Sequence, residues 1–177
     1  MRTHPPSRRT CSYLKLMASF KTICCHEAAH AVMRHLNGMP PGFLWVSETE
    51  GENGGTGEVV DASDELAVQL AGVAWECGFN SQRIDWSASK MSDLEMASAL
   101  LTERPFLRGW RIVETAGGSV AEERSLQDGL RYALACVCDR LKPHRREIEA
   151  LGDLLAIKRE MDGRAVGDWM QTHIPLV

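Results

Sequence analysis

Apolar residues recur at near-helical spacing close to the start of the chain. Residues 12–36 place them on one side of a helix of period 3.6, from Leu14 to Leu36. Asn37-Gly38, followed by Pro40-Pro41, is a strong stop signal, because glycine commonly ends helices and proline cannot continue them. The pattern therefore predicts one long helix over residues 12–36.

Shorter elements follow this helix. Residues 43–47 and 57–60 have the composition of short strands around a glycine-rich, acidic segment, which predicts a β-hairpin. A second helix is expected after Ser63, and it ends at Gly78. Residues 79–91 have no clear period and predict a loop.

Two serine–glutamate pairs have the spacing of a helix-capping box. Ser92 and Glu95 predict the start of a third helix, with Asp93 in its first turn. Ser119 and Glu122 repeat the spacing before a long apolar-periodic stretch that ends near residue 141. Both pairs are therefore interpreted as helix starts.

The last third of the chain also has a helical pattern. Pro143 predicts the start of a helix that runs to about Met161, and Asp162-Gly163 predicts a turn before a short final helix. The expected fold is therefore mainly α (α+β), with one small β-hairpin or sheet beside the first long helix.

Length and composition indicate a single globular domain over residues 12–177, preceded by a disordered polar tail over residues 1–11. The net charge of -4 and the lack of a basic stripe argue against nucleic-acid binding. No apolar run is long enough for a membrane span, and no signal-peptide core is visible. A cytoplasmic protein is expected, and its six cysteines, which form no CxxC pair, are interpreted as reduced thiols in small core sites.

His26, Glu27 and His30 form the sequence HExxH inside the first predicted helix. Helix positions four residues apart lie on one face, about 5–6 Å from each other, so both imidazoles can reach one ion. Zinc suits such a set, with a carboxylate as third ligand, water in the fourth position and Glu27 as the general base for that water. The alternative is a solvated or buried histidine pair with no metal.

The residues alone leave the third ligand open. An HExxHxxGxxH site would need glycine and histidine where the chain has Met33 and Leu36. His35 lies well around the helix from His30, and Cys11 lacks the sequence context of the ligating cysteine found in peptide deformylases.

Four segments together resemble the protease domain of the FtsH family of ATP-dependent, membrane-anchored zinc proteases. CCHEAAHAVM is similar to the family's YHEAGHAVV helix, and LWVSETEGENGGTGEVV is similar to its following strand pair. AGVAWECG resembles the segment GGRxAEE, and MSDLEMASAL resembles SNDxxxAxxxA. The resemblance extends over roughly residues 21–170.

The resemblance implies a specific site with one zinc per chain. His26 and His30 match zinc ligands, Glu27 matches the catalytic base, and Asp93 matches the aspartate that is the third ligand. Glu76 matches the first glutamate of the AEE segment, which implies a supporting position next to the ligands. The chain departs from the family at Ala29, where the family has glycine.

The implied function is that of an ATP-independent zinc metalloendopeptidase. The chain has neither a GxxxxGK[ST] phosphate loop nor a membrane anchor, so a stand-alone peptidase domain is expected. Its substrates would be unfolded or loosely folded polypeptides, bound along an edge strand of the hairpin at residues 43–60 and cleaved by zinc-activated water. The family assembles hexamers, which leaves a homo-oligomer open, and a zinc-binding interaction module without turnover is the alternative function.

Overall fold

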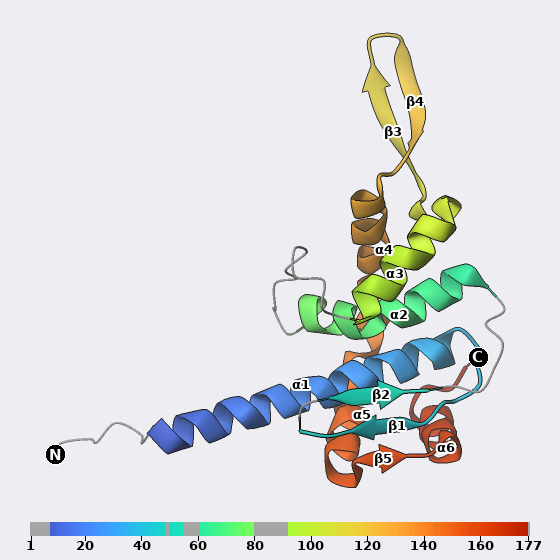
Figure 1. Ribbon diagram of the computed structural model, residues 1–177. Helices are drawn as coiled ribbons and strands as arrows, with labels where there is room; N and C mark the ends of the chain where they lie inside the picture. The colour runs from blue at the N-terminus through green and yellow to red at the C-terminus, as the bar shows by residue number, and fades with distance from the viewer. Residues whose placement is uncertain (1–7, 49, 55–60, 80–91, 177) are drawn as a thin grey trace.

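The computed structural model describes residues 8–48, 50–54, 61–79 and 92–176, and its fold is mainly helical α+β with small antiparallel sheets (Figure 1). The α-helices are α1 (Arg8–Leu36), α2 (Ala62–Gly78), α3 (Ser92–Glu103), α4 (Leu126–Leu141), α5 (Arg145–Lys158) and α6 (Gly163–His173). The strands are β1 (Leu44–Val46), β2 (Gly51–Asn53), β3 (Trp110–Thr115), β4 (Gly118–Glu123) and β5 (Glu160–Met161). Short 3₁₀ turns precede β3 and α5, at Pro105–Arg108 and Lys142–His144.

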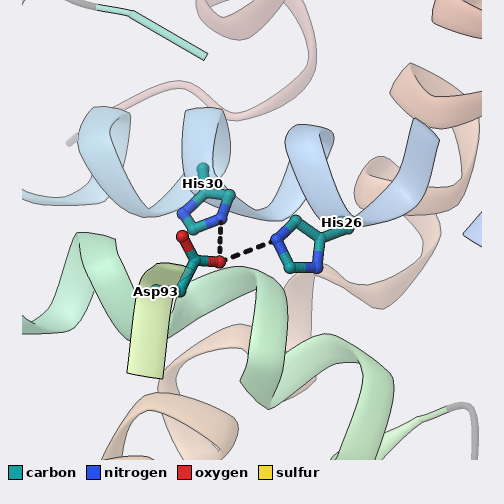
Figure 2. A group of neighbouring side chains, drawn as sticks. All are labelled: His26, His30 and Asp93. Carbon is teal, nitrogen blue, oxygen red and sulfur yellow. Dashed lines mark hydrogen bonds and ion pairs between the residues drawn. The ribbon is translucent and has the colours of Figure 1, made fainter. Parts of the chain in front are cut away.

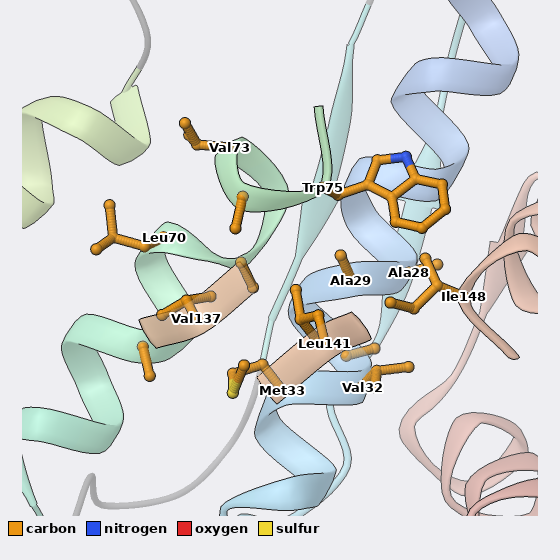
Figure 3. Close-up of a cluster of buried hydrophobic side chains, with 14 of the residues drawn as sticks. Ala28, Ala29, Val32, Met33, Leu70, Val73, Trp75, Val137, Leu141 and Ile148 are labelled. Carbon is orange, nitrogen blue, oxygen red and sulfur yellow. The ribbon is translucent and has the colours of Figure 1, made fainter. Parts of the chain in front are cut away.

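The core forms around α1, which packs against α2 on one side and α5 on the other (Figure 3). Ala28 and Ala29 are fully buried on α1, and their small side chains allow the neighbouring helices to approach closely. Val32 and Met33 extend the same buried surface by one turn. This packing fixes the helix segment that carries HExxH.

Helix α1 is 29 residues long, so it is the one to consider as a candidate membrane span. Its polar positions lower its hydropathy, and within the described ranges no helix is both long and apolar enough to cross a bilayer.

Three short strands form a sheet in the order β2-β1-β5, and both pairings are antiparallel. Leu44 and Val46 of β1 are buried, whereas Trp45 between them is half-buried and faces the other side of the sheet. The sheet thus lies against α1 with one face and leaves the other accessible (Figure 1).

The predicted hairpin is only partly confirmed. The partner of β1 is β2 at residues 51–53, a segment that the sequence predicts as loop. Two contacts with Glu27 of α1 hold this segment in place: Gly51 passes close to its side chain, and Asn53 donates a hydrogen bond to its carboxylate. The strand predicted at residues 57–60 lies outside the described residues, as does most of the predicted loop at 79–91.

The hairpin of β3 and β4 was not predicted from the sequence. It extends away from the body beyond α3 and α4, and nearly all of its residues are exposed (Figure 1). The prediction of a helix cap at Ser119 and Glu122 is wrong, because both residues lie on β4. Ser125 caps α4 instead, since its side chain accepts a hydrogen bond from the Asp128 amide.

Two helix ends also differ from the prediction. Helix α1 begins at Arg8, inside the segment 1–11 predicted as a disordered tail, and residues 1–7 are outside the described part. Helix α5 ends at Lys158, because Arg159 adopts the left-handed conformation with φ 68° and turns the chain into β5. The predicted helix over Ser92 and Asp93 and the final helix α6 are confirmed.

The cysteines only partly fit the prediction that they fill core sites. Cys24 and Cys25 are buried, and burial raises the pKa of Cys24 to about 11 and that of Cys25 to about 12. Cys77 and Cys138 are half-buried, and Cys136 is exposed on α4, so the prediction is wrong for Cys136. All five of these thiols are free, and the side chain of Cys11 lies outside the description.

Two isoleucines on α5 provide a matched test of the core. Ile148 is fully buried, whereas Ile157 on the same helix is 81% exposed. We expect Ile148→Ala to lower the free energy of unfolding by about 2–5 kcal/mol, because it removes buried methylene groups and leaves a cavity. Ile157→Ala should change it by less than about 0.5 kcal/mol. Urea unfolding followed by circular dichroism measures both, and equal losses would contradict this placement of α5.

Candidate metal centre

His26 and His30 lie on successive turns of α1, and their imidazole Nε2 atoms point at the same carboxylate oxygen (Figure 2). The distance to Asp93 Oδ2 is 2.8 Å from His26 Nε2 and 3.2 Å from His30 Nε2. The ring centroids are 4.8 Å apart. One candidate ligand atom from each of the three residues lies within 4.8 Å of the others, so this group could hold a metal ion.

Helix α3 supplies the third member of the group. Asp93 occupies the first turn of α3, so its position in space follows from where that helix begins. The carboxylate reaches across to α1 although 63 residues separate it from His30. The packing of α3 beside α2, which in turn packs against α1, brings these side chains together.

Helix α2 supplies hydrogen-bond partners for the Nδ1 atoms of both imidazoles. His26 Nδ1 lies 2.7 Å from Glu76 Oε1, and His30 Nδ1 donates to the carbonyl oxygen of Val68 at 2.7 Å. Because the carbonyl can only accept, it fixes the proton of His30 on Nδ1 and directs Nε2 toward Asp93. Histidine ligands of metal sites typically have this kind of outer hydrogen bond.

A glycine on α2 makes room for the first imidazole. A Cβ placed on Gly72 would overlap His26 Nε2, so any larger residue would displace the ring. Ala29, the position at which the FtsH family has glycine, is fully buried among apolar side chains of the core. Its methyl group therefore fills core space (Figure 3).

The protonation of His26 is set by its acidic neighbours. Burial lowers the pKa of His26, but the hydrogen bonds with Asp93 and Glu76 outweigh burial and raise that pKa to about 10. Burial likewise raises the pKa of Asp93, but its hydrogen bonds with His26 and His30 hold that pKa well below its usual range. These neighbours favour a proton on His26, which a metal ion bound at Nε2 would have to displace.

Glu27 follows His26 on α1, and its side chain is held by β2. It is only 6% exposed, and Asn53 Nδ2 donates to its Oε2 at 2.9 Å. A Cβ on Gly51 would lie 2.6 Å from Glu27 Cγ, so the strand passes directly over this side chain. A buried carboxylate with this support is fixed in place, yet it is not a member of the three-residue ligand group.

The structure thus brings together His26, His30 and Asp93, and it places Glu76 against His26. His35 is directed elsewhere, since its Nε2 donates to the carbonyl of Ile174 at 2.7 Å. Sequence reasoning missed Asn53 and the Val68 carbonyl. An asparagine in a glycine-rich segment is not recognisable as part of a site from sequence. A backbone carbonyl is present at every residue, so the sequence does not indicate which one takes part.

No protein-family model matches the chain, and a search of curated proteins found no significant match.

Proposed function

We propose that this chain is a zinc-dependent metalloendopeptidase that resembles the FtsH protease domain and acts on unfolded or loosely folded polypeptides without ATP. The observation that carries the proposal is the meeting of His26, His30 and Asp93, with Glu27, the residue after His26 on α1, buried and held by Asn53. A structural metal site would need the three ligands but would have no use for a strand-supported carboxylate beside them.

The donor set fits zinc. Two imidazole nitrogens and one carboxylate oxygen are ligands that zinc commonly takes in catalytic sites, where three protein ligands leave one position open. Zinc bound by these residues would supply Lewis acidity, which lowers the pKa of water to about 7 and polarises a carbonyl group. Glu76 and Val68 would keep the two imidazoles oriented whether or not the ion is present.

The chain's own residues account for the proton transfer. Glu27 is buried and follows the ligand His26 on α1. In this proposal its carboxylate would accept the proton of an attacking water and donate it to the leaving amine. Asn53 holds Oε2, which limits the rotation of the carboxylate and favours one reactive geometry.

An extended substrate would lie along β2. This strand is at the edge of the described sheet, and it passes over Glu27 through Gly51. The free backbone groups of an edge strand can pair with an extended peptide, which would place a peptide bond near the metal site. A folded domain offers no such extended segment until it opens, at a cost of several kcal/mol.

The proposal is tested with one disordered and one tightly folded substrate. We expect the zinc-loaded chain to cleave casein, to leave a stable folded domain intact, and to lose activity when a zinc chelator is added. ATP should not change either rate, because these 177 residues contain no GxxxxGK[ST] loop. Stimulation by ATP would contradict the proposal, and chelator-sensitive peptide binding without any cleavage would favour the interaction module instead.

A further inference from the structure

A second feature lies on the face of the three-stranded sheet that points away from α1. Trp45 of β1 is paired with Glu52 of β2 on one side and with Glu160 of β5 on the other. Directly opposed residues of antiparallel strands project to the same face, so the indole lies between two carboxylate side chains.

These residues line a hollow of about 350 Å³. Phe43 and Asp162 also line it, which gives two aromatic rings and three carboxylates around one space. No lysine or arginine is part of its lining among the described residues. The hollow therefore combines apolar ring surface with negative charge.

The carboxylates on either side of Trp45 have no cationic partner within the described part of the chain. The nearest candidate in sequence, Arg159, is engaged elsewhere, since it pairs with Glu48 at 2.8 Å and lies over the Phe20 ring at 4.0 Å. Asp162 uses Oδ1 to cap α6 by accepting a hydrogen bond from the Ala165 amide.

The other sheet of the molecule shows the usual alternative. On the β3–β4 hairpin, Arg111 stands opposite Glu122, and the two form an ion pair of 3.1 Å. In the three-stranded sheet, by contrast, the position between two glutamates is occupied by tryptophan. Strands in a sheet are about 4.8 Å apart, so the two glutamate positions are separated by about 10 Å across the indole. A cation placed over the ring would lie between them.

We propose that this hollow binds an organic cation, a guanidinium or alkylammonium group, over the ring of Trp45 and between Glu52 and Glu160. Tryptophan is the aromatic side chain that attracts cations most strongly. The two carboxylates beside it, which have no cationic partner among the described residues, add charge attraction. The group can come from an arginine or lysine side chain of a polypeptide or from a free small cation. The site is separate from the metal centre, because Gly51 and Asn53 of β2 face Glu27 whereas Glu52 projects to the opposite face.

The test follows the Trp45 indole N–H signal by NMR in the full chain, with the signal assigned through Trp45→Phe. The probes are a blocked Gly-Arg-Gly peptide, the same peptide with neutral citrulline in place of arginine, and the small cation agmatine. We expect the arginine peptide and agmatine to shift the signal and the citrulline peptide to bind about tenfold more weakly or not at all. Tighter binding of the peptide than of agmatine would identify a polypeptide as the source of the cation, and equal binding would identify the free cation as sufficient.

The variants separate this site from the rest of the surface. Glu52→Gln combined with Glu160→Gln should weaken the arginine peptide about tenfold or more. Glu95→Gln, an exposed charge on α3, should leave the affinity unchanged. Equal binding of the citrulline peptide, or full affinity in the double variant with an unchanged thermal melting curve, would overturn the proposal.

The metal centre is controlled separately. Binding should persist in the presence of a zinc chelator, and its loss there would overturn the assignment to this hollow. Cleavage of casein can fail without affecting this result, so the two proposals stand or fall independently.

Discussion

Asp93→Ala is expected to lower the zinc affinity of the chain by more than about 100-fold. Loss of an outer hydrogen-bond partner of a metal ligand typically costs about 10–100-fold, and the loss of a ligand should exceed that. Asp93 is also the group on which both Nε2 atoms converge, so its removal takes away the third ligand and the acceptor that aligns the pair. Glu76→Ala should show the smaller effect, about 10–100-fold, because Glu76 contacts only the outer nitrogen of His26.

The measurement is a competition titration with a chromophoric zinc chelator, with Glu103→Ala as the control. Glu103 lies at the far end of the same helix, is exposed and is not a member of the ligand group, so its loss should leave zinc binding at about one ion per chain. If Glu76→Ala abolished binding while Asp93→Ala preserved it, the assignment of the third ligand would be wrong.

Zinc affinity should also fall as the pH is lowered. The pKa of His26 in the metal-free protein is raised to about 10, so His26 is protonated over the whole neutral range and its proton competes with the ion. Release of one proton corresponds to a change in affinity of roughly tenfold per pH unit below that pKa. The same titration at pH 6 and pH 8 measures the slope, and a flat profile would show that His26 is not a ligand.

The first helix and two of the candidate ligands, His26 and His30, could be predicted from the sequence, because both predictions depend on local spacing. His26 and His30 share a face on any helix, and the stop at Asn37-Gly38 is local too. Asp93 is different, since nothing in its spacing from His30 indicates a contact. Only the resemblance to a known family suggested it, and in the structure the contact depends on how α3 packs beside α2.

The parts that the sequence did not predict have weak or ambiguous local signals. A strand is recognised by alternation between a buried and a solvated face, and β3 and β4 have no buried face to create it. Ser119 and Glu122 matched a capping box by spacing alone, while Ser125 and Asp128 formed the actual cap. Strand β2 contains glycine and two polar residues, so its contact with α1 through Glu27 could not be read from composition.

Glu27→Gln is expected to retain the fold and the zinc but to lower the rate of peptide hydrolysis by about 10²–10⁴-fold. Glutamine has nearly the same shape and can still bond to Asn53, but its amide cannot accept a proton from water. A full loss of zinc in this variant would instead make Glu27 a ligand, contrary to its position outside the group of His26, His30 and Asp93.

Two further variants separate proton transfer from the position of the carboxylate. Glu50→Gln changes an exposed glutamate immediately before β2 and should leave the rate unchanged. Asn53→Ala removes the hydrogen bond to Oε2 but keeps the carboxylate, so it should lower kcat less than Glu27→Gln does and leave zinc binding intact. Hydrolysis of a fluorogenic casein conjugate, with zinc content measured on the same samples, gives both quantities. An undiminished rate in Glu27→Gln would remove this residue from the mechanism, because the proton of the water would then have to go to another group.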